Sequence, residues 1–421
     1  MPRIPRNIPV SDRPAPSLRA NFAATLAGNV LFGASQWAVL SLIAKLGDSA
    51  MLGQYALAVA IVTPIAMFSH LNLRAVLATD IEQKHPFGDY LVVRLGTTAL
   101  GLTAILAIAL ASGYGWPVAP AVMVVGIALS TDNLSDIYYG LLQRRERMDQ
   151  IACSMMARGL LSAAALGVAL GLTRSLVAAV VALALGRVAV LLAFDRPAAS
   201  AGESLARTGI GVQAAIFRTA LPLGVVLMLI SLVNNLPRYV IEHSLGTVEL
   251  GAFAAVASFS TVGSTAVNAL GQAATPRLAR HFSAGELPRF RALALRLTAA
   301  AFLLGAAGVL AAALLGRFIL GLVYRPTYSA YAGLLVWVMG AAVLSYVAIA
   351  LGYVITSARS FVPQVPLLAA VACSAGVASW VLVPRLRLGG AALALAAASC
   401  VQIAGELWIL RRTLRERGAA A

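Results

Sequence analysis

Long apolar runs follow one another along almost the whole chain. Breaks at charged residues, Gly and Pro divide the 421 residues into twelve such runs, each close to the roughly 20 residues that a membrane-spanning helix needs. Charged residues make up only 11% of the chain and the mean hydropathy is +0.86, whereas a soluble domain carries about 25% charged residues. The sequence therefore predicts an all-α integral membrane protein. Its twelve transmembrane helices are expected near residues 21–44, 51–73, 90–112, 117–141, 150–171, 175–194, 214–235, 248–272, 292–316, 331–356, 362–384 and 389–410.

The basic residues predict how the helices are oriented. Of the 32 Lys and Arg, 23 fall in the amino-terminal segment, the carboxyl-terminal tail and every second loop, and seven fall in the opposite loops. Short loops rich in Lys and Arg stay in the cytoplasm, so both termini are expected there and the 237–247 loop outside. Basic residues spread over short loops beside anionic head groups also account for the net charge of +16 without a nucleic-acid partner.

Two turns that lie 199 residues apart share one pattern. Leu46-Gly47 precedes Leu52-Gly53-x-Tyr55, and Leu245-Gly246 precedes Leu250-Gly251-x-Phe253. Such self-similarity indicates a duplicated unit, although two unrelated hairpins with similar glycine turns would give the same pattern. The sequence thus predicts a parallel internal repeat of two six-helix lobes, 21–194 and 214–410. A cytoplasmic linker (195–213) is expected between them, with a disordered tail (1–20) before and a cytoplasmic tail (411–421) after.

Several kinds of chemistry have no matching motif. The three Cys fall in or beside apolar runs, which argues against a disulfide framework. The four His form no i,i+4 pair and neither Lys follows Gly, so neither a zincin-type metal site nor a phosphate-binding P-loop is predicted. We therefore expect no metal, no cofactor and no enzymatic activity.

Five charged residues fall inside or near the ends of apolar runs: Asp132, Asp136, Arg158, Arg187 and Glu406. A charge at mid-bilayer costs roughly 2.5–3.5 kcal/mol, so it faces a cavity or a partner. Helical rise places Asp132, Arg158 and Arg187 about 10–14 Å from the cytoplasmic ends of consecutive helices, and Asp132 is therefore a candidate to face Arg158. Two explanations fit: a salt-bridged latch that only neutralises itself, or a cationic, water-filled cavity in which Arg exceeds acid and binds phosphate oxygens.

Other polar residues in the apolar runs have less distinctive explanations. Asp136 and Glu406 lie nearer the membrane surface, where a solvated helix face explains them at least as well. Asn29 and Gln36 add amides to the first run. Single amides in membrane helices more often bond a neighbouring helix than a ligand.

The second turn belongs to a longer pattern. Ala220-Leu221-Pro222-Leu223-Gly224, then Asn234-Asn235-Leu236-Pro237-Arg238-Tyr239 and the two Leu-Gly turns, resemble the start of the second half of bacterial polysaccharide flippases. These are the O-antigen and capsule type of the multidrug/oligosaccharidyl-lipid/polysaccharide exporter superfamily. The resemblance covers nearly the whole chain, from Asn21 to about Leu410. It implies two six-helix lobes around a cavity open to one leaflet at a time, in the bacterial cytoplasmic (inner) membrane.

The resemblance also implies a substrate and partners. The substrate would be an undecaprenyl-diphosphate-linked oligosaccharide, moved from the cytoplasmic to the periplasmic leaflet. Membrane lipids, a polysaccharide polymerase and chain-length proteins would be the partners. Arg158 and Arg187 are then expected to contact the diphosphate, and Asp132 to hold Arg158 between substrate visits. Arg238 is expected at the exterior end of the seventh helix, and the remaining candidates for substrate binding are Asn29, Gln36 and Asn234.

Two rival functions stay open at this point. A cation-coupled multidrug exporter of the same fold is expected to favour a cavity dominated by acidic and aromatic residues. A membrane glycan polymerase or ligase is expected to carry a sizeable exterior loop with catalytic residues. If an ion drives transport, Asp132 or Glu406 could carry it.

Overall fold

The computed structural model describes residues 18–80, 85–200, 205–358 and 363–419. Every regular element in these ranges is helical, and they contain no strand. The chain divides into two compact units. The first unit comprises Met1–Leu46 and Ile61–Met228, and the second unit comprises Gly47–Ala60 and Leu229–Ala421.

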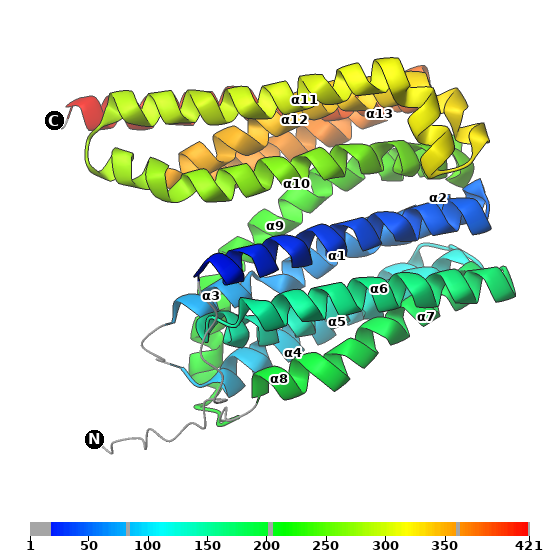
Figure 1. Cartoon of the computed structure of the whole chain (residues 1–421), viewed down its shortest axis with the longest axis horizontal. Helices are drawn as coiled ribbons and strands as arrows, with labels where there is room; N and C mark the ends of the chain where they lie inside the picture. The colour runs from blue at the N-terminus through cyan, green and yellow to red at the C-terminus, as the bar shows by residue number, and fades with distance from the viewer. Residues whose placement is uncertain (1–17, 81–84, 201–204, 359–362, 420–421) are drawn as a thin grey trace. The chain divides into compact units, whose positions relative to one another are not determined.

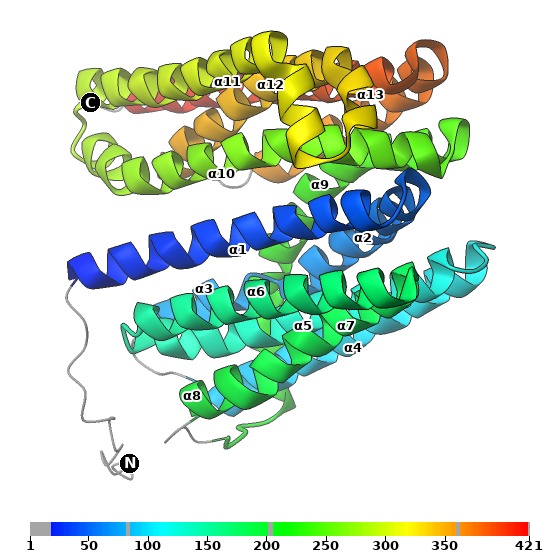
Figure 2. The same cartoon turned by 45° about the vertical axis from the view of Figure 1, so that its right-hand side comes forward.

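The helices of each unit pack beside one another, as Figures 1 and 2 show for α1 with α6 and for α12 with α11 and α13. Two helices, α2 (Ser49–His70) and α9 (Ile210–Leu245), have residues in both units. The first unit also contains α1 (Leu18–Leu46), α3 (Leu73–Thr79), α4 (Phe87–Ala111), α5 (Val118–Arg144), α6 (Met148–Thr173), α7 (Leu176–Val190), the π-helical turn η1 (Leu191–Asp195) and α8 (Arg196–Ser200). The second unit also contains α10 (Thr247–Ser283), α11 (Leu287–Val323), the 3-10 helix η2 (Pro326–Tyr331), α12 (Ala332–Ser357) and α13 (Gln364–Ala419).

Eleven helical segments of the described chain are long and apolar enough to cross a membrane. The last of them contains two spans, because Arg387 interrupts α13 with non-helical dihedral angles (φ 52°, ψ −137°). Beyond this point the chain turns back, so that Ala398 packs against Val371 and Ala375. The twelve predicted runs therefore each have a helix, and the predicted all-α fold is confirmed.

Helices α9, α10 and α11 are longer than the apolar runs predicted for them. The predicted 237–247 loop is wrong, because α9 continues to Leu245 and only Gly246, at φ 88°, separates it from α10. The polar residues that suggested a loop bond within the helix: the Asn235 amide donates to the Ser231 carbonyl at 2.9 Å, and Arg238 donates to Asn235 at 3.2 Å. Polar side chains that are satisfied locally do not end a helix.

The outer surface of α11 is strongly apolar. Leu303, Leu314 and Phe318 are 65%, 73% and 67% exposed. A soluble monomer rarely exposes a contiguous apolar surface of this kind. Such a face suits contact with lipid chains.

The matched glycine turns pack against each other in the second unit. A Cβ atom at Gly53 would lie 2.6 Å from the Thr247 carbonyl carbon and 3.1 Å from the Gly251 nitrogen, and one at Gly251 would lie 2.9 Å from the Gly53 nitrogen. Each glycine therefore permits the other turn's backbone to approach. The second glycine of each turn is therefore a packing requirement at this contact.

Helix α2 has a weakened point in its middle. Pro64 has no backbone N–H and leaves the carbonyl four residues earlier without its helical donor. That carbonyl belongs to Ala60, and the Tyr239 hydroxyl of α9 donates to it at 2.5 Å. The unsatisfied backbone group of α2 is thus capped from α9 within the second unit.

Candidate functional site

Asp132 of α5 holds two arginines of the neighbouring helices. Its Oδ1 accepts from Arg158 Nη1 of α6 at 3.0 Å, and its Oδ2 accepts from Arg187 Nη1 of α7 at 2.5 Å. Both arginine side chains are 4% exposed, whereas the Asp132 side chain is 22% exposed. The structure thus places Asp132 against Arg158, and it adds Arg187 to the same carboxylate.

A second acid lies behind Arg158. The Tyr139 hydroxyl contacts Arg158 Nη2 and lies 2.7 Å from the Ser154 hydroxyl, which in turn donates to Asp195. Asp195 Oδ2 is 3.9 Å from Arg158 Nη2, and Asp195 is fully buried. These side chains form one continuous polar network inside the first unit.

The charges of this network balance. Two arginines, Arg158 and Arg187, are matched by two carboxylates, Asp132 and Asp195. The predicted excess of Arg over acid is therefore wrong for this cluster. Sequence reasoning ended the sixth run at residue 194 and assigned Asp195 to the linker. In the structure, the π-helical turn η1 continues α7 and keeps Asp195 in the core.

Of the two amides predicted on the first helix, one joins the network. Gln36 Oε1 accepts from Arg187 Nη2 at 3.3 Å. Asn29 is exposed and donates to the Thr25 carbonyl of its own helix at 2.9 Å. The ring of Phe32, on the same helix, lies 5.8 Å from the Arg158 guanidinium carbon. Helix α1 thus contributes one polar and one aromatic contact to the arginine pair.

The network is most accessible at Asp132. The two guanidinium groups and Asp195 lie deeper, since their side chains are at most 4% exposed. The Nε atoms of Arg158 and Arg187 are buried and have no hydrogen-bond partner among the described residues. An anion that reaches the guanidinium groups would therefore meet Asp132 and compete with it.

A second ionic cluster surrounds Asp136, one helical turn further along α5. Its carboxylate lies 2.9 Å from His70 Nε2, 3.4 Å from Arg74 Nη1 and 3.7 Å from Arg94 Nη2. The explanation of Asp136 as part of a solvated face is therefore wrong. Arg94, which stands near the start of the predicted run 90–112, lies inside α4 and is fully buried. Basic groups exceed acid in this cluster.

Residues of the same region stabilise the chain where α2 ends and α3 begins. Leu71 and Asn72 both adopt φ 49°, which ends α2. The Ser69 carbonyl then lacks a helical donor, and it accepts from Arg94 at 3.2 Å and from Thr97 at 3.0 Å. Arg94 was missed because its sequence position marks the start of a run, where a charge is expected to face water.

The remaining predicted site residues belong to the second unit. Asn234 is exposed and donates to the Ile230 carbonyl of α9 at 2.9 Å. Arg238 contacts Asn235 within the same helix, seven residues before the end of α9. Glu406 is 5% exposed and accepts from Gln402 at 3.0 Å, so the solvated-face explanation is wrong for Glu406 as well.

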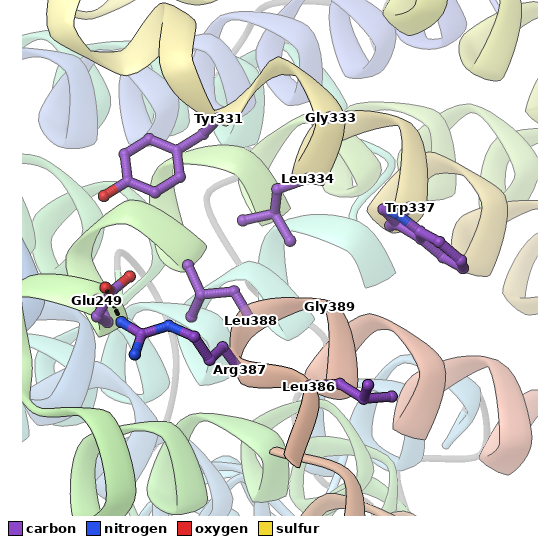
Figure 3. A pocket seen from close by; sticks show the side chains of 9 residues that line it. All are labelled: Glu249, Tyr331, Gly333, Leu334, Trp337, Leu386, Arg387, Leu388 and Gly389. Carbon is purple, nitrogen blue, oxygen red and sulfur yellow. Dashed lines mark hydrogen bonds and ion pairs between the residues drawn. The ribbon is translucent and has the colours of Figure 1, made fainter. Parts of the chain in front are cut away.

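A pocket of about 370 Å³ lies in the second unit and contains none of the predicted site residues. Figure 3 shows Arg387, at the turn of α13, pointing toward Glu249 at the start of α10; the two groups are 2.6 Å apart. Tyr331, the last residue of η2, and Trp337, near the start of α12, lie on the other side of the pocket. The ion pair ties the turn of α13 to α10.

Comparisons of sequence give polysaccharide-biosynthesis proteins. A family model described as "Polysaccharide biosynthesis protein" matches residues 123–282. The capsular polysaccharide biosynthesis protein CapF of Staphylococcus aureus is 22% identical over 397 residues, which cover 93% of this chain and 99% of CapF.

Comparisons of structure give transporters. An inward-facing multidrug resistance MATE family transporter of the MOP superfamily aligns with a TM-score of 0.78 at 13% identity, over 94% of this chain and all of that one. The lipid II flippase MurJ, in an inward closed conformation, aligns with a TM-score of 0.73 at 9% identity, over 95% of this chain and 90% of that one.

These likenesses extend along nearly the whole chain. The chain has the fold of the multidrug/oligosaccharidyl-lipid/polysaccharide exporter superfamily, and its resemblance to the polysaccharide flippases of that superfamily is confirmed.

Proposed function

We propose that this protein flips a lipid-linked oligosaccharide, carried on undecaprenyl diphosphate, from the cytoplasmic to the periplasmic leaflet. The proposal places it in the bacterial inner membrane with both termini in the cytoplasm. The family match and the capsular relative support a role in polysaccharide biosynthesis. The structural likeness to MurJ supports a lipid-linked substrate.

The observation that carries the proposal is the buried arginine pair behind Asp132. A diphosphate cannot enter hydrocarbon unaided, because desolvating its charge is prohibitive. Arg158 and Arg187 are two preformed donors whose guanidinium forks fit phosphate oxygens. Their present acceptor, Asp132, is the most exposed member of the group. Exchange of Asp132 for the substrate diphosphate would keep both arginines paired throughout the cycle.

The same contacts also suit a purely structural latch. In that case Asp132 neutralises the arginines permanently, and the loss of any member would reduce the amount of folded protein. The two roles are distinguished by stability: a substrate site tolerates some variants that fold but do not transport, and a latch does not.

The polysaccharide role is favoured over the two rival functions. The described connections on the predicted exterior side are short; Gly47–Asp48 and Tyr324–Arg325 are two examples. They leave little room for the catalytic loop of a polymerase or ligase. A multidrug exporter shares the fold, so the fold does not separate it from a flippase. The sequence relatives support the flippase.

The experiment is a deletion of the gene, followed by complementation with variants. The deletion should leave lipid-linked oligosaccharide on the cytoplasmic leaflet, and the wild-type gene should restore surface glycan. Arg158→Ala and Arg187→Ala should abolish export, and Arg158→Lys should recover part of it, since a point charge replaces a bidentate fork. Arg289→Ala is the matched control, because Arg289 is 71% exposed and pairs only locally with Glu286.

Membrane abundance is measured beside surface glycan for every variant. Normal glycan export by stable Arg158→Ala and Arg187→Ala proteins would refute the diphosphate site. Loss of small-drug export with unchanged surface glycan in the deletion strain would identify the protein as a multidrug exporter instead.

A further inference from the structure

Three carboxylates are buried in the described parts of the chain, and their environments differ. Asp89 accepts from the Thr208 backbone N–H through both oxygens and from the Gln213 amide, each at 3.1 Å. Asp195 accepts from Ser154 and lies near Arg158. Glu406 accepts one bond, from the Gln402 amide to Oε1 at 3.0 Å, and its Oε2 has no partner. Glu406 is therefore the buried acid whose negative charge has the least compensation.

The helix that faces Glu406 supplies no opposite charge. A Cβ atom at Gly352 of α12 would lie 3.4 Å from Glu406 Oε1, so α12 passes close to the carboxyl at this residue. Helix α12 contains no Asp, Glu, His, Lys or Arg. Its two titratable residues are tyrosines: Tyr346 donates to the Ser260 carbonyl and Tyr353 donates to Asn268.

The charged groups on the other nearby helices are also engaged or exposed elsewhere. On α13 itself, Arg387 pairs with Glu249 and Arg412 lies over the Trp408 ring. On α9, which contacts α13 at Leu236, Arg238 contacts Asn235 and His243 stacks on Trp380. No Lys, Arg or His lies within ion-pair distance of the Glu406 carboxyl among the described residues.

We infer that Glu406 is a proton-binding site of the second unit. An ionised carboxylate with one amide donor in an apolar helix interface is far less favourable than a neutral acid. The acid form keeps the bond from Gln402 on Oε1 and carries its proton on Oε2. When a conformational change opens the α12–α13 interface to water, the O–H bond breaks, the proton passes to water and the carboxylate is left hydrated.

The site adds proton exchange to the proposed flippase and does not depend on it. A neutral carboxylic acid in an apolar environment reacts with the lipophilic reagent dicyclohexylcarbodiimide, and an ionised or ion-paired one does not. The labelling can therefore be measured on purified protein in the absence of any transported substrate.

The experiment labels the full-length protein in detergent at pH 6 and at pH 9, with peptide mapping by mass spectrometry. The expected result is an adduct on Glu406 that is several-fold weaker at pH 9 and absent in Glu406→Gln. Asp136, held by His70 and two arginines, is the internal control and should stay unlabelled at both pH values.

Two variants at one position test the cause. Gln402→Leu removes the amide donor and should keep Glu406 protonated and labelled. Gln402→Lys places an ammonium group one helical turn away, should hold the carboxylate ionised, and should remove the label at pH 6. Absence of the adduct at pH 6 in folded wild-type protein, or equal labelling of the two Gln402 variants, would overturn the inference.

Discussion

Replacement of Asp132 by Asn tests whether the arginine pair is a phosphate site. The carboxylate bonds two guanidinium groups at 3.0 and 2.5 Å. Removing one partner of a buried ion pair costs about 3–5 kcal/mol. Asp132 is 22% exposed, and the Asn amide oxygen keeps one bond, so we expect a loss of about 2–3 kcal/mol. For a unit of this size that loss lowers the melting temperature by roughly 5–10 °C.

Inorganic diphosphate should reverse most of this loss. A ligand present at 100 times its dissociation constant stabilises the folded state by about 2.7 kcal/mol, which matches the expected deficit. The anion would occupy the space of the missing carboxylate and bond both arginines. The gain in melting temperature with diphosphate should therefore be larger in Asp132→Asn than in the wild type, where Asp132 competes.

The assay heats the detergent-solubilised protein with and without diphosphate. The folded protein that remains at each temperature is measured by size-exclusion chromatography. Asp195→Asn is the matched control, because Asp195 lies fully buried behind Arg158 and an anion cannot replace it. It should lose stability and gain nothing from diphosphate. Equal diphosphate shifts in Asp132→Asn, Asp195→Asn and Arg187→Ala would refute the reasoning.

Three further predictions concern a glycine contact, the charge pair and the membrane topology. Gly53→Ala should reduce folded protein markedly, since overpacking costs roughly 1–3 kcal/mol and the new Cβ would meet the Thr247 backbone; Gly33→Ala, which has open space, should leave the yield unchanged. The charge swap of Asp132→Arg with Arg158→Asp should fail to restore folded protein, because it places Arg beside Arg187 and Asp beside Asp195; recovery of membrane abundance would show that the two residues pair in isolation. With the native cysteines replaced, Ser244→Cys before the Gly246 turn should react with an impermeant maleimide on whole cells. Ala284→Cys, at the other end of α10, should react only after permeabilisation, and the reverse pattern would invert the topology.

The helices could be predicted from sequence because lipid imposes a simple rule. A chain segment in hydrocarbon must satisfy its own backbone groups, so each apolar run of sufficient length becomes a helix. The ends of α9, α10 and α11 could not be predicted in this way. These helices are 36 or 37 residues long, and beyond the hydrocarbon their polar residues no longer distinguish helix from loop.

The candidate site could be predicted from the sequence only in part. The depth of Asp132 and Arg158 along consecutive helices predicted their contact, because helical rise is fixed. Rotation about each helix axis is set by packing, so the sequence did not show that Arg187 shares the same carboxylate. A solvated face explained Glu406 because its sequence position lies nearer the membrane surface, yet the side chain is buried in the packed helices.

The helical hydrogen bond that α2 lacks at Pro64 gives this helix one position at which it can bend more easily. Ala60, whose carbonyl loses its donor to Pro64, is also the last residue of α2 that belongs to the second unit, and Ile61 begins the part that belongs to the first. A helix bends with least resistance where an internal hydrogen bond is absent. Because Tyr239 already satisfies the Ala60 carbonyl from outside the helix, bending here would break no bond of the α2 ladder. Any bending of α2 is therefore expected at the step from Ala60 to Ile61, where the helical hydrogen-bond pattern is already interrupted.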